Sequence, residues 1–362
     1  MNIYFNLFKV KFAKLYELIN KHSLINNNDK GVNVFINLEE IIIKLCNPKV
    51  DEYLRVANEN KHIELISEIL NLASHYRLFF TKNGIKSNIY LYMQYPFTGV
   101  QKNIVFNKDY RKYYSYKFNN DISYFALSEA LKSAIPLTKI VLEYVEGVYF
   151  IQCENIENSL VPKVISEHTK SDYVNFIVTS NIYDYQYVNH GYNIIISKQD
   201  KSEILTKDNV IDYICDINEI NDKVNISSKM IPFILSIIGS KYRNIYNIKG
   251  FGIKKTFKLL EKALSEGLIT PNIDNINILL SVIKSGYRDI ILMNYYCSDI
   301  SFQYDQLNAK DIHDITSQLV DKFDNVSLKK LNDKFFENSP INLIELTSTV
   351  VEKTTKPKVT FN

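Results

Sequence analysis

The chain has 362 residues, of which 46% are hydrophobic and 23% are charged, and its formal net charge is +3. A chain of this length can bury a large core in one sizeable domain or in two smaller ones, and its composition excludes a disordered chain. The net charge is too small to indicate nucleic-acid binding by itself, so such binding would depend on local basic patches.

The cysteines and histidines do not form a recognisable metal or disulfide framework. Cys46, Cys153, Cys215 and Cys297 lie far apart, and the six histidines are scattered, so we expect reduced thiols and no zinc site. Charged residues interrupt the apolar run 1–25 too often for a membrane span, and we expect an amphipathic helix there and no membrane partner. The absence of Trp and the many Asn, Ile, Lys and Tyr residues are compatible with an AT-rich bacteriophage genome. We therefore expect a cytoplasmic protein, in the host cytoplasm if the source is viral.

Hydrophobic periodicity predicts an alternation of strands and helices along the chain. Short apolar runs predict strands at 32–36, 88–95, 139–144, 148–151, 175–179, 192–197 and 203–206. Apolar residues three and four positions apart predict helices at 38–45, 63–80, 123–134, 230–238, 276–283 and 319–336. The polar run 208–228 is predicted to be a connection of low complexity.

A glycine-rich turn between two apolar runs occupies residues 239–260, GSKYRNIYNIKGFGIKKTFKLL. Its glycines permit a tight turn between two helices and the close approach of another backbone. Amides at the start of the second helix, with lysines beside them, suit a phosphate group. We interpret the stretch as a helix-hairpin-helix that binds nucleic acid through Lys249, Gly250, Gly252, Lys254 and Lys255. The alternative is an ordinary pair of helices whose lysines face water.

Basic and aromatic residues alternate in a second stretch, 110–117, YRKYYSYK. Such a segment can hold a nucleic-acid strand through phosphate contacts and base stacking. Arg111, Tyr116 and Lys117 are the predicted contacts. A solvated, tyrosine-rich loop is the alternative.

The glycine-rich stretch resembles the DNA-binding hairpin of the 5′-nucleases, a family that includes flap endonucleases, bacteriophage 5′-exonucleases and the 5′-nuclease domain of bacterial DNA polymerase I. The family pattern is roughly G-D-x-x-D-N-I-P-G-V-x-G-I-G-x-K-T-A-x-x-L-L. The matching residues are Gly239, Asn244, Ile245, Gly250, Gly252, Lys254, Leu259 and Leu260. The two metal-binding aspartates of the pattern are replaced by Ser240 and Arg243.

Three further segments resemble the same family in the same order along the chain. Residues 110–117 resemble an F-R…Y-K segment that leads into the arch through which a single strand passes. Residues 178–188 resemble V-S-x-D-x-D-x-x-Q-L-V, with Gln186 retained and with Asn181 and Tyr183 at the positions of the two aspartates. Residues 290–300 resemble the N-x-x-L-x-D-L segment that follows the hairpin.

The resemblance, which extends from about residue 32 to residue 300, implies a fold and a domain organisation. It implies an α/β, PIN-like 5′-nuclease domain over 1–228, with a central, mostly parallel sheet flanked by helices and an arch-like segment around 97–135. A helical subdomain with the helix-hairpin-helix would follow over 229–346. Residues 347–362 are predicted to be a flexible tail, or else a short peptide that docks to a protein partner.

At the other positions where the family has metal-binding acids, this chain has mostly neutral residues. The first strand of the family ends in an aspartate, and here it ends at Asn37, with Glu39 and Glu40 nearby. At the end of the second predicted strand the candidates are Met93, Gln94 and Tyr95, none of them acidic.

Residues 153–161 resemble the family's E-A-D-D-x-I segment in two possible registers. One register keeps Glu154 and Glu157 as acids, and the other places Asn158 and Ser159 at the positions of the two aspartates. Neither register restores the full acidic cluster.

Two-metal phosphodiester hydrolysis needs several carboxylates, because two cations about 4 Å apart must be neutralised. The degenerate positions are Asn37, Asn158, Asn181, Tyr183, Ser240 and Arg243, so we expect no metal site, no cofactor and no assignable catalytic residue. The hypothesis is a catalytically degenerate 5′-nuclease homologue that binds branched or single-stranded DNA, with RNA left open, in a phage replication or structural context.

Two alternatives remain. One is an active, Mg²⁺-dependent 5′-3′ exonuclease or flap endonuclease whose acids have moved, for example to Glu154, Glu157, Asp184 and either Glu39 or Glu40. The other is a protein-interaction or virion component that binds no nucleic acid, in which the Tyr-rich segments would anchor an interface.

Overall fold

The computed structural model describes residues 11–26, 31–38, 61–94, 135–145, 147–154, 156–169, 172–196, 202–220, 224–239 and 245–320, together with 329, 330 and 333. The predicted helices at 123–134, 38–45 and 319–336 lie wholly or mostly outside these residues. So do the basic and aromatic segment 110–117 and the tail 347–362.

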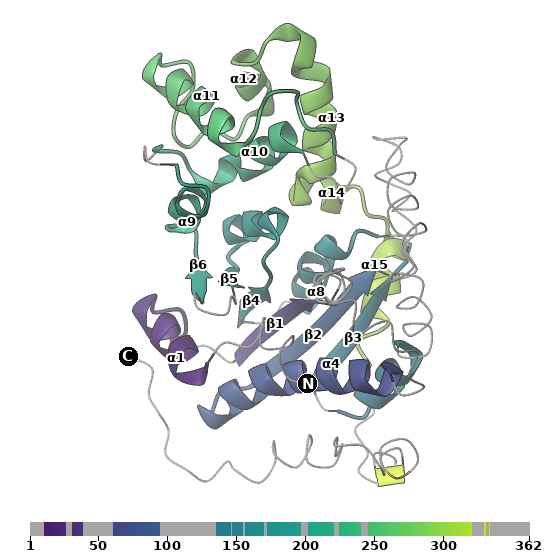
Figure 1. Cartoon of the computed structure of the whole chain (residues 1–362). Coiled ribbons are helices and arrows are strands. Elements are labelled where there is room, and N and C mark those ends of the chain that lie inside the picture. The colour runs from purple at the N-terminus through teal and green to yellow at the C-terminus, as the bar shows by residue number, and fades with distance from the viewer. Residues whose placement is uncertain are drawn as a thin grey trace.

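A six-stranded sheet forms the centre of the molecule, in the order β3-β2-β1-β4-β5-β6 (Figure 1). All neighbouring strands are parallel except β5 and β6, which are antiparallel. The strands are β1 (Gly31–Asn37), β2 (Ser87–Gln94), β3 (Val148–Cys153), β4 (Tyr173–Val178), β5 (Asn193–Ile196) and β6 (Glu203–Leu205). Helices flank the sheet, so the predicted α/β fold with a mostly parallel sheet is confirmed.

One face of the sheet packs against α1 (Phe12–Lys21), α4 (Lys61–Lys82) and a further helix at 135–142. The prediction of a strand at 139–144 is therefore wrong. Its apolar side chains Val141, Leu142 and Val145 recur at helical spacing and are buried in the core that α4 also lines.

The other face packs against α8 (Val161–Thr169) and against two 3₁₀ helices, η3 (Asn158–Leu160) and η4 (Ile182–His190). The run 208–228 was predicted to be a connection, but it contains the helix α9 (Val210–Ile217). This helix also contributes to the core. Its buried residues, Val210, Ile211, Ile214 and Cys215, form a single apolar face.

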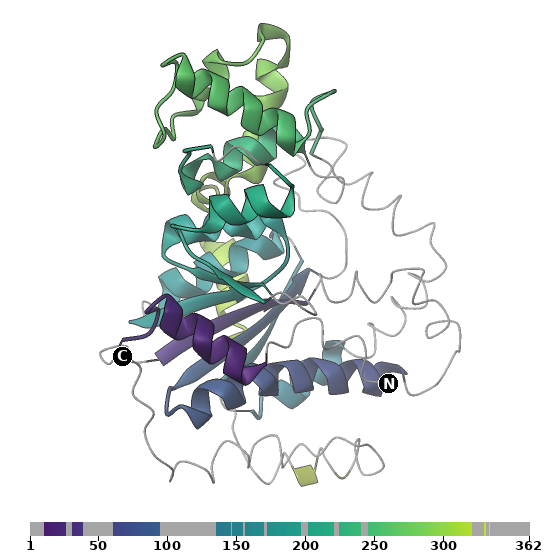
Figure 2. The same cartoon turned by 60° about the vertical axis from the view of Figure 1, so that its left-hand side comes forward.

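A group of helices continues the fold beyond the sheet, at the opposite end of the molecule from α4 (Figures 1 and 2). These are α10 (Ile231–Ile238), α11 (Ile253–Ser265), α12 (Ile276–Ser281), α13 (Arg288–Ser298) and α14 (Ile300–Asp305). The chain then returns through α15 (Ala309–Thr316), which packs on α8 and β3. In the described ranges, no helix combines the length and the apolar character needed to cross a membrane.

A row of asparagine amides crosses the sheet near the amino ends of its central strands. Asn88 of β2 donates to Asn33 of β1 over 3.2 Å, and Asn33 donates to Asn175 of β4 over 2.9 Å. The three residues are directly paired in the strand register. A slip of one residue would break both bonds, so the row fixes the register.

A row of stacked rings lies next to the amides on the same face, because side chains alternate between faces along a strand. The rings of Phe35 and Tyr90 stack at 4.8 Å, and those of Tyr90 and Tyr149 at 5.2 Å. Two residues further along β1 and β2, Asn37 is paired with Tyr92. This register places Asn37 at the carboxyl end of the sheet.

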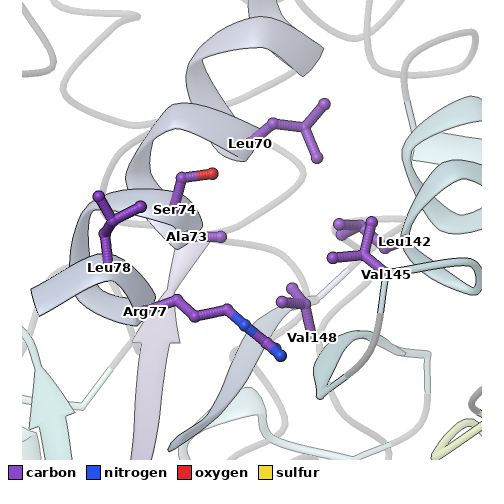
Figure 3. A pocket seen from close by; sticks show the side chains of 8 residues that line it. All are labelled: Leu70, Ala73, Ser74, Arg77, Leu78, Leu142, Val145 and Val148. Carbon is purple, nitrogen blue, oxygen red and sulfur yellow. The ribbon is translucent and has the colours of Figure 1, made fainter. Parts of the chain in front are cut away.

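A small, mostly apolar pocket lies on the opposite face, between α4 and the helix at 135–142 (Figure 3). Arg77 points into it, and a Cβ atom added to Gly147 would lie only 2.8 Å from Arg77 Nη1. Gly147 directly precedes β3, so the pocket is at the amino end of the parallel strands, at the other end of the sheet from Asn37.

Candidate functional site

Two asparagines meet at the carboxyl end of β1. Asn37 is the last residue of β1 and Asn158 is the first residue of η3, and their side chains are 4% and 3% exposed. Asn158 Nδ2 donates to Asn37 Oδ1 over 3.4 Å, although the two residues are 121 positions apart in the chain. The fold thus brings together two of the positions that the sequence singled out, and both carry neutral amides.

The strand register adds a residue that sequence reasoning missed. Tyr92 lies beside Asn37 on the neighbouring strand and is fully buried. Of the predicted candidates, Met93 is at odd spacing from Asn88 and Tyr90 and faces the other side of the sheet, Gln94 lies beyond the last residue pair of β1 and β2, and Tyr95 lies outside the described residues. The row of Asn88 and Asn33 is the signal that could have identified Tyr92.

The turn after β4 holds the other two neutral positions. Asn181 precedes η4, and its Oδ1 accepts a hydrogen bond from the backbone N–H of Tyr183 over 3.1 Å. Thr179 donates its hydroxyl to Asp184 over 2.7 Å and accepts the N–H of Asn181 over 3.0 Å. Asp184 is completely buried, so its carboxylate stabilises the turn that positions Asn181 and Tyr183.

The two acids near these residues differ in exposure. Glu154 is exposed after β3, whereas Glu157 is 3% exposed and immediately precedes η3. Searching the described residues gives no cluster of three or more His, Cys, Asp or Glu side chains that could hold a metal ion. Ser240, Arg243, Glu39 and Glu40 lie outside the described residues.

Gln186 joins the turn after β4 to the helical part of the chain. Its Nε2 donates to the carbonyl oxygens of Tyr183 and Ser298 over 2.8 and 2.9 Å, and its Oε1 accepts the N–H of Ile300 over 2.9 Å. The side chain is 2% exposed. All three bonds are made inside the protein, so Gln186 fixes η4 against the junction of α13 and α14.

His190, at the end of η4, lies against α14. A ring nitrogen, Nε2, is 3.3 Å from the hydroxyl of Ser301. Burial, and then the positive charge of Lys163, lower the pKa of His190, while Asp299 and Glu167 act in the opposite direction. The imidazole is therefore held in its neutral form more strongly than an exposed histidine.

The helices α10 and α11 contact each other, and residues 245–252 lead into α11, whereas residues 240–244 lie outside the described residues. Gly239 has φ of +63°, and a Cβ atom there would lie 2.6 Å from both Asn247 N and Ile245 O. The backbone of residues 245–247 therefore approaches Gly239 so closely that no residue with a Cβ atom would fit at this position. Asn294 of α13 holds this arrangement, since its Nδ2 donates to the carbonyl oxygens of Ser236 and Tyr246 over 2.8 and 2.7 Å.

The start of α11 presents glycines and lysines to solvent. Gly250 has φ of +84°, and Gly252 precedes the first turn with open space around its Cα. Lys249, Lys254 and Lys255 are exposed. Lys254 forms a 3.5 Å ion pair with Glu219, which is itself largely exposed. Among the described residues no side chain caps the amides of this turn.

The three other predicted nucleic-acid contacts, Arg111, Tyr116 and Lys117, lie outside the described residues. Their contact with nucleic acid stays a prediction.

The sheet order, its flanking helices and the helical part beyond it define a PIN-like 5′-nuclease fold. Two solved structures share it over 87% of this chain and 99% of their own chains. One is the flap endonuclease of bacteriophage T5 in a pseudo-enzyme–product complex with DNA and metal ions, at 12% identity and a TM-score of 0.50. The other is the T5 5′-exonuclease with zinc ions bound, at 11% identity and a TM-score of 0.52. No protein-family model matches the chain, and no curated protein matches its sequence.

Proposed function

We propose that this protein is a catalytically degenerate 5′-nuclease homologue that binds branched or single-stranded DNA. The observation that carries the proposal is the hydrogen bond between Asn158 and Asn37 at the buried carboxyl end of β1. The resemblance implies aspartates in this region, and carboxylates are the ligands that hard divalent cations prefer. Two neutral amides that bond to each other offer such a cation no charge.

The surrounding side chains support the same reading. The contact with Asn37 favours the register in which Asn158 and Ser159 take the aspartate positions. Tyr92 is buried beside Asn37 in the strand register, and Tyr183 is buried in η4, so neither position offers a carboxylate to a cation. On this proposal the protein uses no cofactor.

The DNA-binding part of the proposal rests on the hairpin. An uncapped helix start, an open glycine and exposed lysines form a site that suits a phosphate of the DNA backbone. The shared fold supports DNA as the ligand, since one solved structure with that fold contains DNA. Lys249, Gly250, Gly252, Lys254 and Lys255 form the proposed surface, with Arg111, Tyr116 and Lys117 as further contacts.

The proposed organisation keeps a PIN-like domain over 1–228, with an arch around 97–135, and a hairpin subdomain over 229–346. The tail 347–362 is proposed to be flexible, and binding of a protein partner is the alternative. The proposed setting is phage DNA replication, or a structural assembly, in the host cytoplasm.

The test is a paired assay on a 5′-labelled flap and on a nicked duplex. We expect binding in EDTA and no cleavage with Mg²⁺ or Mn²⁺. Affinity should fall with salt, with a slope of log K against log salt of about −0.9 per neutralised duplex phosphate. Lys255→Glu should reduce that slope, whereas Lys262→Glu, at the far end of α11 and already paired with Glu266, is the matched control.

One observation favours the alternative of an active enzyme. Glu157 is buried directly beside Asn158, so an acid does lie at this end of the sheet. Cleavage that is lost in Glu157→Gln would establish a rearranged metal-dependent nuclease. Absence of binding to either DNA at low salt would instead favour a protein-interaction or virion component.

A further inference from the structure

Strand β3 is an edge of the sheet formed by the described strands. Its six residues, VYFIQC, include no charged residue, no proline and no glycine. Edge strands of this composition pair readily with other chains, because their outward N–H and C=O groups are unpaired and their side chains favour β structure. An exposed β3 would therefore be a site of self-association.

A glutamine side chain occupies this edge. Gln318 Oε1 accepts the backbone N–H of Gln152 over 3.1 Å, and Gln318 Nε2 donates to the carbonyl oxygen of Gln152 over 3.0 Å. A residue of a neighbouring antiparallel strand would make the same two bonds to Gln152. The side-chain amide of Gln318 thus takes the place of one peptide unit of a further strand.

Other contacts hold the amide in this orientation. Lys139 Nζ donates to Gln318 Oε1 over 3.0 Å, and Gln318 Nε2 also donates to the carbonyl oxygen of Asp314 over 2.6 Å. Gln318 directly follows α15, which packs on β3 and α8 (Figure 1). The position of α15 therefore determines whether the amide reaches the strand.

Among the described residues, a hollow lies along the edge beside the amide. Phe150 lies two residues before Gln152, so its backbone groups point to the same side, away from β2. A hollow next to Gln318 is lined by Lys139, Tyr149, Phe150 and Val320. An added strand would have to bond Gln152 and Phe150 in succession, and Gln318 blocks the first of them.

We propose that Gln318 is an edge guard that prevents β3 from pairing with the β3 strand of a second copy of this chain. Two such strands would pair antiparallel about a two-fold axis, and neither strand has a charged residue of its own. Displacement of α15 would remove the guard and expose the edge.

The test compares Gln318→Ala with Ser317→Ala, which changes an exposed neighbour that lines the same hollow. At a dilution where both variants are monomeric, we expect hydrogen exchange at the Gln152 amide to rise up to about tenfold in Gln318→Ala, the equivalent of one lost hydrogen bond. Light scattering should show a concentration-dependent dimer for this variant and a monomer for Ser317→Ala. Unchanged exchange, or faster exchange without a dimer, would overturn the proposal.

A second substitution separates edge pairing from general destabilisation. Gln152→Pro removes the outward N–H of β3 and leaves its bonds to β2 in place, which an edge strand tolerates. The double variant Gln318→Ala/Gln152→Pro should return to a monomer. A dimer that persists in the double variant would show that association occurs elsewhere.

Discussion

Asn158 donates a side-chain hydrogen bond to Asn37 across the carboxyl end of the central strand. The bond is neutral and buried, and it joins η3 to β1 without any charge to neutralise. An amide pair can therefore stabilise this end of the sheet in the absence of a cation, which a pair of carboxylates could not do because of their repulsion.

The double variant Asn37→Asp/Asn158→Asp should be less stable than the wild type by roughly 2–5 kcal/mol at pH 8. Burial and mutual repulsion raise the pKa of both new carboxyls, so the loss should shrink as the pH falls toward 4 and the carboxyls are protonated. Urea unfolding at the two pH values measures this. An increase of the unfolding midpoint in millimolar Mg²⁺ would reveal a surviving cation pocket and contradict the proposed degeneracy.

Gln186→Glu should cost roughly 3–5 kcal/mol near pH 8, because a carboxylate oxygen would replace the nitrogen that now donates to two carbonyl oxygens. The loss should decrease in acid, where a protonated carboxyl can donate to one of them. Gln303→Glu is the matched control, since Gln303 Nε2 donates to the single carbonyl oxygen of Cys297. Equal losses for the two variants would show that Gln186 has no special role in joining η4 to α13.

Substitution by alanine should have different effects on stability at two glycines of the hairpin. Gly239→Ala should destabilise the protein by roughly 3 kcal/mol or more, because its φ is positive and its Cβ would meet backbone atoms of the turn. Gly252→Ala meets open space, and its stability should stay within about 0.5 kcal/mol of the wild type. Its affinity for DNA should nevertheless fall. Thermal unfolding and a binding assay in EDTA distinguish the two, and unimpaired binding by Gly252→Ala would exclude this turn from the interface.

Glu219→Gln should raise the affinity for DNA at low salt by about twofold to fivefold, because it frees Lys254 from an exposed ion pair. The gain should vanish at high salt as the charges are screened. Glu266→Gln frees Lys262 at the other end of α11 and should have no effect. An equal gain in both variants would indicate a general response to net charge.

The stability of the protein should fall as the pH decreases from about 7 to 5, in part because of His190. Its pKa in the folded protein lies below the ordinary value, so the unfolded chain takes up the proton first and acid favours unfolding. His190→Gln should flatten this dependence. Some slope should remain, since the pKa of His22 is also lowered, by burial and by Lys21. An unchanged slope in His190→Gln would mean that other groups dominate acid unfolding.

Much of the sheet could be predicted from the sequence, because each strand is a short apolar run between polar turns. The helix at 135–142 was predicted in part as a strand, since a short run such as 139–144 fits both periods and only packing against α4 decides between them. The helix α9 was missed because it lies within a run that is polar as a whole, and two aspartates, Asp212 and Asp216, interrupt its apolar residues.

The candidate site was predictable as a set of positions but not as an arrangement. Asn37 and Asn158 were both singled out, yet their contact depends on strand order and on the path of residues 38–157. Tyr92 was missed because the register of β1 and β2 cannot be read from either strand alone. Gln186 was matched by pattern, and its bonds to backbone atoms give it a structural role. Asn294, which lies in the matched segment 290–300, also bonds to backbone atoms.

Gln318, which covers the edge of strand β3, is synthesised 166 residues after its partner Gln152. At about 5–20 residues per second, a ribosome needs on the order of ten seconds or more to reach Gln318 after Gln152. Throughout that interval the nascent chain carries a β-prone segment that its own amide does not yet cover. Chaperones bound to the emerging chain would have to protect it, and slower translation of residues 153–317 should lower the yield of folded protein without changing the stability of molecules that have already folded.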